Sequence, residues 1–89
     1  MKLLFTEDGW DDYLHWQATD RGVLERINTL LRDSTRQPFK GLGKPEPLRG
    51  EFAGWWSRRI TGEHRLIYRI VGKGEEQRLE IVMCRYHYG

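Results

Sequence analysis

The residue types that could do chemistry together fall at three places in the sequence. Glu46 stands between two prolines, which restrict the backbone and hold the carboxylate in a limited set of directions. Arg59 and Arg65 lie on either side of a short glycine-containing connection, and His87 lies close to the C-terminal end. A carboxylate and a histidine can transfer protons near neutral pH, and arginines hydrogen-bond to phosphate oxygens. Chemistry on a phosphate group would use this combination.

The two arginines become direct neighbours if the chain turns back at Gly62. A hairpin centred there would oppose Arg59 and Arg65 on one face of a sheet, where like charges repel unless an anion lies between them. A phosphate suits that place, because the guanidinium group is planar, always charged and able to stabilise charge that develops at phosphorus. Neutralisation by a nearby carboxylate is an equally good interpretation. The candidates are Glu46, Glu51 and Glu63.

The C-terminal segment Arg85-Tyr86-His87-Tyr88 combines groups that bind or stack on nucleic acid. If the last strand pairs with the sheet, it holds this segment beside the arginines, and His87 can act as a general acid. Aromatic side chains can also stack on bases, and core packing is the better interpretation for at least one tryptophan. The stacking candidates are Tyr86, Tyr88, Trp55 and Trp56. His15 and His64 are interpreted as structural or surface residues.

A metal, a cofactor and a cysteine nucleophile are not expected. Cys84 is the single cysteine, so no internal disulfide is possible, and with His87 it supplies too few ligands for a closed zinc site. It also stands in the apolar run 81–84, and a free cysteine in such a run is usually buried. The glycines at positions 41, 43, 72 and 74 lack the spacing and the strand-to-helix setting of a phosphate-binding loop.

Composition limits the class of protein. The 89 residues suffice for one domain, 1–89, and the net charge of +2 does not by itself indicate nucleic acid. The distribution of charge is more informative, because residues 7–20 hold five acidic residues and no Lys or Arg, whereas residues 36–69 hold eight Lys or Arg residues against three Glu. That second region is either a surface for a polyanion or a set of solvated charges. No apolar run spans a bilayer and the first residues do not form a secretory signal, so a cytoplasmic location is expected.

The sequence predicts a strand and two helices before the arginines. Residues 3–6 form a short apolar run, followed by helical spacing from Glu7 to about Ala18 with Thr6 as a candidate N-cap. A second helix begins after Asp20, where apolar residues recur at helical spacing. Its stripe consists of Val23, Leu24, Ile27, Leu30 and Leu31. The short connection between the helices predicts an antiparallel hairpin that packs on a common sheet.

The second half predicts a loop and three strands. Between residues 34 and 51 the prolines and glycines exclude a regular helix and a central strand. Residues 55–60, 64–71 and 78 to about 86 then predict a three-stranded antiparallel meander. In the middle strand Leu66, Tyr68 and Ile70 alternate with Arg65 and Arg69, so one apolar face should receive the helices. The expected class is α+β.

Five blocks of sequence, spread over nearly the whole chain, form a set that one family shares. They are Trp10-Asp11-Asp12-Tyr13-Leu14, Gly43-Lys44-Pro45-Glu46-Pro47-Leu48, Trp56-Ser57-Arg58-Arg59-Ile60-Thr61, Glu63-His64-Arg65-Leu66 and Cys84-Arg85-Tyr86-His87-Tyr88. Together they resemble the YoeB toxins of the RelE/ParE superfamily of bacterial type II toxin–antitoxin modules. The resemblance implies a RelE-like microbial RNase fold and a ribosome-dependent endoribonuclease that cuts mRNA in the ribosomal A site and inhibits translation. It also implies a YefM-like cognate antitoxin and the capacity to form a homodimer. No membrane partner is expected, and no DNA binding by the toxin by itself.

The resemblance also implies working residues, and they fall on Glu46, Arg49, Arg59, Arg65, His87 and Tyr88. On this hypothesis Glu46 takes a proton from the ribose 2′-hydroxyl, the two facing arginines stabilise the charged phosphorus centre, and His87 protonates the departing 5′-oxygen. Arg49 assists with phosphate charge and Tyr88 positions the nucleotide. The expected products, formed without metal, are a 2′,3′-cyclic phosphate and a 5′-hydroxyl.

The chain departs from the family pattern at two places. Gly89 extends it beyond the tyrosine with which such chains often end, so the terminal carboxylate is displaced by one residue. The turn 72–77 is longer than expected and should alter surface contacts only. Two other classes share these features in part: ParE-like toxins, which poison DNA gyrase on the same fold, and plain RNA-binding modules. Glu46 together with His87 argues against the ParE-like class, and the RNA-binding module stays open as an alternative.

Overall fold

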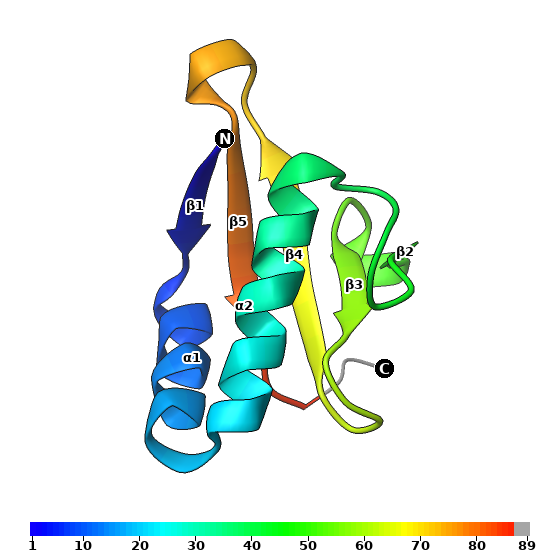
Figure 1. Cartoon of the computed structure of the whole chain (residues 1–89). Coiled ribbons are helices and arrows are strands. Elements are labelled where there is room, and N and C mark those ends of the chain that lie inside the picture. Colours follow the sequence, from blue (N-terminus) through cyan, green and yellow to red (C-terminus); the bar gives the residue numbers. More distant parts are fainter. Residues whose placement is uncertain (87–89) are drawn as a thin grey trace.

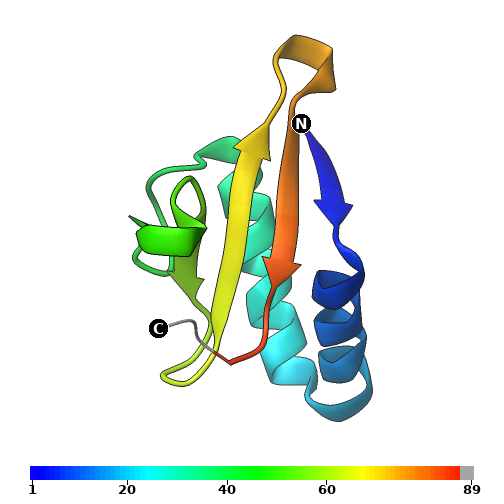
Figure 2. The same ribbon diagram turned by 180° about the vertical axis from the view of Figure 1, so that it is seen from behind.

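A computed structural model gives the fold and describes residues 1–86. Two helices, α1 (Glu7–Thr19) and α2 (Arg21–Arg36), follow strand β1 (Lys2–Phe5). The other strands are β2 (Glu46–Pro47), β3 (Trp56–Arg59), β4 (Arg65–Val71) and β5 (Arg78–Met83). Two short 3-10 turns, η1 (Gly50–Phe52) and η2 (Gly74–Glu76), complete the elements. Figure 1 shows α1 and α2 side by side across one face of the sheet, and Figure 2 shows the opposite face from behind.

The helix hairpin agrees with the prediction, including its caps. The Thr6 hydroxyl accepts a hydrogen bond from the Gly9 N–H at 3.1 Å, and the Asp20 carboxylate accepts one from the Val23 N–H at 3.1 Å. Such side-chain acceptors satisfy backbone donors that have no partner within the helix. The predicted stripe of α2 faces inward, because Ile27, Leu30 and Leu31 are buried. In the described chain no helix is long and apolar enough to cross a membrane.

The sheet contains the predicted meander but is larger than predicted. Strands β3, β4 and β5 pair antiparallel in chain order. The strand order β1-β5-β4-β3-β2 adds one strand at each edge: β1 lies parallel to β5, and β2 lies antiparallel to β3. Strand β2 falls within the proline-rich loop, where an edge position allows Pro47 because its missing N–H is not needed on the outer side. Strand β5 also ends at Met83, three residues before the predicted end.

The two faces of the sheet differ in what covers them. The face under the helices, here called the covered face, presents Arg58, Leu66, Tyr68, Leu79 and Ile81. Directly paired residues share a face, so the registers define an open face on the other side. It presents the exposed Glu46 and Arg59, the half-buried Arg65 and Arg69, and the buried Ser57, Ile67 and Glu80. The alternation predicted for the middle strand is therefore confirmed, with Leu66 and Tyr68 fully buried under the helices.

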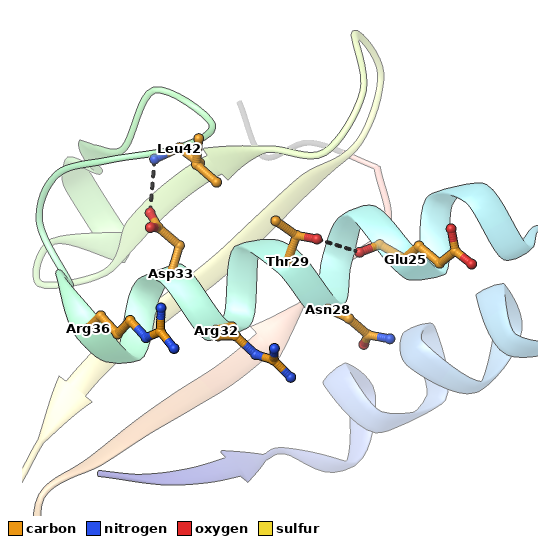
Figure 3. Close-up of a pocket in the computed structure, with 7 residues that line it drawn as sticks. All are labelled: Glu25, Asn28, Thr29, Arg32, Asp33, Arg36 and Leu42. Carbon is orange, nitrogen blue, oxygen red and sulfur yellow. Dashed lines mark hydrogen bonds between the residues drawn. The ribbon is translucent and has the colours of Figure 1, made fainter.

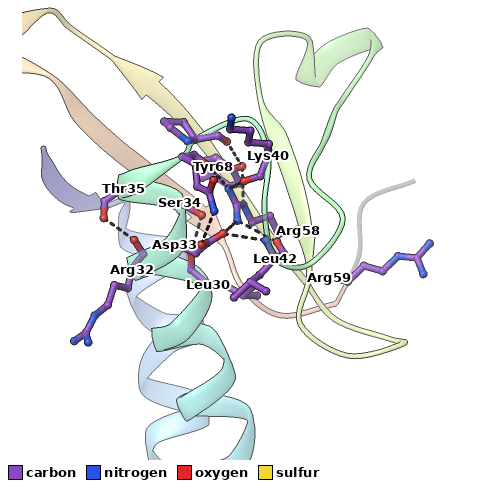
Figure 4. Close-up of polar contacts among 12 residues, drawn as sticks. Leu30, Arg32, Asp33, Ser34, Thr35, Lys40, Leu42, Arg58, Arg59 and Tyr68 are labelled. Atoms are coloured by element: carbon purple, nitrogen blue, oxygen red, sulfur yellow. Dashed lines mark hydrogen bonds and ion pairs between the residues drawn. The ribbon is translucent and has the colours of Figure 1, made fainter.

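Arg58 corrects one sequence-based expectation. We counted it among the charges of the basic region, but its side chain is fully buried on the covered face. All of its guanidinium donors are used: Nε donates to the Tyr68 hydroxyl at 2.9 Å and Nη1 to the Asp33 carboxylate at 2.6 Å (Figure 4). The remaining bonds, of 2.6–3.0 Å, go to the backbone carbonyls of Gln37, Lys40 and Leu42. Arg58 therefore fixes the start of the loop that carries Glu46.

A second anchor holds the same loop nearer to Glu46. The Arg59 N–H donates to the Gly43 carbonyl at 2.7 Å, which ties the loop to the end of β3. Gly43 has a φ of +79°, and a Cβ there would lie only 3.0 Å from a Leu30 methyl group and 3.1 Å from the Arg59 carbonyl oxygen. A glycine is favoured at this position, because residues with a Cβ rarely adopt this backbone angle and a Cβ would make the neighbouring atoms shift. The loop is thereby ordered up to the edge strand that bears Glu46.

Candidate functional site

Three of the residues that we predicted for the site share the open face. Arg59 on β3 and Arg65 on β4 are directly paired across the sheet, which confirms the hairpin predicted about Gly62. Glu46 on β2 pairs with Ser57, two residues before Arg59 on the same strand. Glu46 is therefore a diagonal neighbour of Arg59, and long side chains at diagonal positions can reach one another. The register thus brings one carboxylate and two guanidinium groups to one part of the open face.

The two arginines of the pair are held differently. The Arg65 Nη1 donates to the carbonyl oxygens of Thr61 at 2.8 Å, His64 at 3.1 Å and Gly62 at 3.3 Å, so its guanidinium lies on the β3–β4 turn. Arg59 is exposed, and its side chain points away from the buried arginine cluster in Figure 4. Among residues 1–86 no hydrogen bond or ion pair engages the Arg59 guanidinium. The site thus combines one fixed cation with one whose donors remain free for an anion.

Neutralisation by Glu46, Glu51 or Glu63 was the other interpretation of the arginine pair. Within residues 1–86 no ion pair joins Glu46 or Glu63 to Arg59 or Arg65; Glu63 instead lies 3.7 Å from the His64 Nε2. Among the described residues, the exposed Glu46 carboxylate therefore has no ion-pair partner. Arg49, also exposed, lies immediately before the η1 turn and close in sequence to Glu46.

The adjacent tryptophans fall on opposite faces, as alternation along a strand requires. Trp56 lies on the covered side, where it packs against the core and against Phe39 with ring centroids 4.9 Å apart. This confirms core packing for one of the pair. Trp55 lies on the other side under the Arg69 guanidinium, 4.4 Å from its ring centroid, and Arg69 also pairs with Glu80 at 2.7 Å. Trp55 is thus half-buried and makes a cation–π contact with an arginine that is already paired with a carboxylate.

The predicted residues His87 and Tyr88 lie outside the described residues. The chain that leads to them is described as far as Tyr86, and it returns from β5 to the β3–β4 hairpin. The Arg65 N–H donates to the Tyr86 carbonyl oxygen at 2.8 Å, and the Tyr86 N–H donates to the His64 Nδ1 at 2.7 Å. His64, which we interpreted only as structural or surface, therefore binds the backbone next to His87. No spacing rule in the sequence indicates that contact.

Cys84 fits the interpretation as a buried residue rather than a nucleophile. Its side chain is fully buried against α1, where the thiol lies 3.8 Å from the Gly9 carbonyl oxygen. Burial and the nearby Asp12 carboxylate raise the pKa of the Cys84 thiol to about 12. The thiol therefore stays protonated at neutral pH, and thiolate is the reactive form. Within residues 1–86 no group of three or more histidine, cysteine or carboxylate side chains could hold a metal ion.

A hollow of about 450 Å³ runs along α2 and is lined by Glu25, Asn28, Thr29, Arg32, Asp33, Arg36 and Leu42 (Figure 3). Most of its lining comes from α2, on the opposite side of the sheet from the Arg59 and Arg65 side chains. This hollow is therefore separate from the predicted site.

Comparison with known proteins gives consistent similarities. A family model described as "YoeB-like toxin of bacterial type II toxin-antitoxin system" matches residues 5–88. The Toxin YoeB of Escherichia coli K12 is 52% identical over 88 residues, which cover 99% of this chain and 100% of that protein. A YoeB/ParE toxin structure from Agrobacterium tumefaciens is 60% identical with a TM-score of 0.95, covering 99% and 100% of the two chains.

Two structures from Staphylococcus aureus add information on assembly. One is a YoeB dimer and the other is a heterotetrameric YoeB–YefM toxin–antitoxin complex. Each is 35% identical to this chain with a TM-score of 0.86, covering 99% of this chain and 98% of the other. The identity and the coverage extend over the whole described fold, including β1 and β2.

Proposed function

The chain belongs to the YoeB-like toxins of bacterial type II toxin–antitoxin systems, and from that premise we propose that it is a ribosome-dependent endoribonuclease. Its substrate is mRNA in the ribosomal A site, and its cutting inhibits translation. The observation that carries the proposal is the direct pairing of Arg59 with Arg65 on the open face, beside a free carboxylate at Glu46. Like charges placed in this way suit a bound phosphodiester.

The reaction proposed is an in-line displacement at phosphorus without metal. Glu46 takes the proton of the ribose 2′-hydroxyl, whose oxygen forms a new bond to phosphorus, while the bond to the 5′-oxygen breaks. Arg59 and Arg65 stabilise the charge on the phosphorus oxygens, and the free donors of Arg59 suit the larger part of that role. His87 gives its proton to the departing 5′-oxygen. The products are a 2′,3′-cyclic phosphate and a 5′-hydroxyl.

Two further residues complete the proposed site. Arg49 is exposed beside β2 and assists in binding phosphate. Tyr88 positions the nucleotide, by stacking or by hydrogen bonding through its hydroxyl. With a carboxylate and one histidine as the only proton-transfer groups, cutting depends on the ribosome to place the 2′-hydroxyl in line with the scissile bond.

The proposed partners follow from the relatives. We propose that a YefM-like antitoxin binds and neutralises the toxin, which the existence of the Staphylococcus aureus YoeB–YefM complex supports, and that the free toxin is a homodimer like the Staphylococcus aureus YoeB dimer. The basic open face suits an acidic antitoxin segment that folds on binding. We further propose that residues 1–89 act as one domain, in the cytoplasm where the ribosomes are.

The test is translation of one defined mRNA by purified bacterial ribosomes with wild type or His87→Ala, followed by mapping of the cut ends. We expect cuts at A-site codons with 5′-hydroxyl ends from wild type, and a loss of cutting in the variant. Equal cutting by the variant removes His87 from the mechanism, and 5′-phosphate ends refute the cyclic-phosphate route. Wild type that binds ribosomes without cutting is an RNA-binding module, and wild type that inhibits gyrase instead is a ParE-like toxin.

A further inference from the structure

The segment that joins β5 to His87 is held by a short series of hydrogen bonds. The Cys84 N–H donates to the Asp12 carboxylate at 3.0 Å, and the Trp16 Nε1–H donates to the Cys84 carbonyl at 2.8 Å. Two residues later, Tyr86 bonds to the His64 Nδ1 through its N–H and to the Arg65 N–H through its carbonyl. We call residues 84–86 with these partners the C-terminal latch. It ties the end of the sheet to α1 on one side and to the β3–β4 hairpin on the other.

The contact at His64 defines the state of that ring. Because Nδ1 accepts the Tyr86 N–H at 2.7 Å, Nδ1 carries a lone pair and the ring proton is on Nε2, which faces the Glu63 carboxylate at 3.7 Å. The side chain is 13% exposed, and the ring packs edge-on against Trp16 with centroids 4.7 Å apart. Position and tautomer are therefore both set by neighbouring groups.

Tyr86 needs such a hold because its backbone is strained. Its φ is +65°, in the left-handed region that a residue with a bulky side chain rarely adopts. Strained conformations persist where the surroundings determine them, and here both the N–H and the carbonyl of Tyr86 are bound by the residues 64 and 65. The peptide bond that follows the Tyr86 carbonyl leads directly into His87.

We propose that His64 is a positioning residue of the site, and that its unprotonated Nδ1 fixes Tyr86 in the left-handed conformation that directs the chain into His87. This inference rests on the proposed function, since it gives His64 a part in placing the general acid. His64 acts through the Tyr86 backbone and does not contact the phosphate. Without the Nδ1 acceptor of His64, Tyr86 can relax to an ordinary backbone conformation. The direction in which the chain leaves Tyr86 then changes.

The experiment compares three variants in the ribosome cutting assay. His64→Leu fills a similar volume without an acceptor, and His64→Asn places its Oδ1 near the position of Nδ1, where it can accept the Tyr86 N–H. His15→Leu is the matched control, because His15 also packs edge-on against Trp16, at 4.8 Å, yet makes no bond to residues 84–86. Steady-state cutting with ribosome–mRNA complexes in excess over the toxin gives kcat at saturation, and its dependence on the concentration of these complexes gives KM.

We expect His64→Leu to lower kcat by about 10- to 100-fold with little change in KM, because a small misplacement of a reacting group has effects of that size. His64→Asn should recover most of the loss, and His15→Leu should cut like wild type. Equal kcat for His64→Leu and wild type, or an Asn variant no better than the Leu variant at equal thermal stability, overturns the inference.

A second measurement keeps this inference separate from the proposed function. Nitrogen NMR of the free wild-type protein should show an unprotonated Nδ1 on His64, and hydrogen exchange of the Tyr86 amide should be slower in wild type and His64→Asn than in His64→Leu. A protonated Nδ1, or equal exchange in all three proteins, overturns the latch whether or not the toxin cuts RNA. Failure of wild type to cut while the latch is observed refutes the proposed function instead.

Discussion

Arg58 and Arg59 are consecutive residues of one strand with opposite fates. Arg58 lies under the helices and is 0% exposed. Its guanidinium donates hydrogen bonds to Asp33, Tyr68 and three backbone carbonyls. Arg59 points to the open face, and no described residue bonds its guanidinium. The same chemical group is therefore a structural cross-link on one face and a free cation on the other. Which face a strand residue occupies, rather than its charge, decides whether it belongs to the fold or to the site.

The largest effect should come from Arg58→Met compared with Arg59→Met. Removal of Arg58 leaves the Asp33 carboxylate and several carbonyls without their partner, and breaking a buried pair in this way costs about 3–5 kcal/mol. Arg59→Met should change the free energy of unfolding by no more than about 0.5 kcal/mol. Urea unfolding of both variants measures the difference. Equal losses of stability would remove the distinction between the two arginines.

The next effect is on activity rather than stability, and here Arg59 is the residue that matters. Arg59→Ala should lower ribosome-dependent cutting by about 10²–10³-fold, which is the usual cost of losing one group that stabilises transition-state charge. Its folding should remain close to that of wild type, because the guanidinium has no partner within residues 1–86. Cutting rates at saturating ribosomes, with unfolding measured in parallel, test this. An active Arg59→Ala protein would transfer the phosphate role to Arg65 or Arg49.

A smaller effect should appear in the stability of the fold at acid pH, and it tests the buried pair of Arg58 with Asp33. Hydrogen bonds from Gln37, the Leu42 N–H and Arg58 lower the pKa of Asp33 to about 2. A depressed pKa stabilises the fold above the unfolded value of 3.8, and that stabilisation is lost as the pH falls toward about 2. The contribution is about 2 kcal/mol. Wild type should therefore lose its advantage over Asp33→Asn between about pH 4 and pH 2, and a constant advantage over that range contradicts the assignment.

The smallest effect concerns the thiol of Cys84, the first residue of the latch. Since burial raises the pKa of Cys84 to about 12, the folded protein should react with a thiol reagent at neutral pH only through unfolding. The reaction rate should therefore rise with urea in step with the unfolded fraction, and Arg58→Met should react faster than wild type. A rapid reaction in native conditions would place Cys84 on an accessible surface. It would also reopen the question of a cysteine nucleophile.

Features set by local patterns were predictable from sequence. The stripe of α2, its cap at Asp20 and the opposition of Arg59 with Arg65 follow from spacing within short windows, and the structure has all of them. The burial of Arg58 was missed. Its spacing of two residues from Trp56 and from Ile60 is a local signal that the three side chains share one face. The sheet positions of the two edge strands, β1 and β2, were not predicted. Pairing between distant segments leaves little trace in a short window of sequence.

The site was predictable in part for the same reason. Glu46 was singled out by its flanking prolines, but the two-residue strand that aligns it with Ser57 is too short for any periodicity. The role of His64 depends on a backbone N–H that arrives from 22 residues away. Such a bond is fixed by the path of the chain after β5, and residue types alone do not reveal it. The positions of His87 and Tyr88 stay a prediction.

The pairing of β1 with β5 also determines when the fold can be completed during synthesis of the chain. Thr6 bonds to Ile81 across 75 residues, and the first strand made has its place only beside the last one. The ribosome makes the chain from its N-terminal end. Helix α1 therefore cannot pack against β5 until that strand has left the ribosome. A chain whose β5 has not yet left the ribosome therefore has no finished latch. On the proposed function, such a chain cannot yet cut an mRNA.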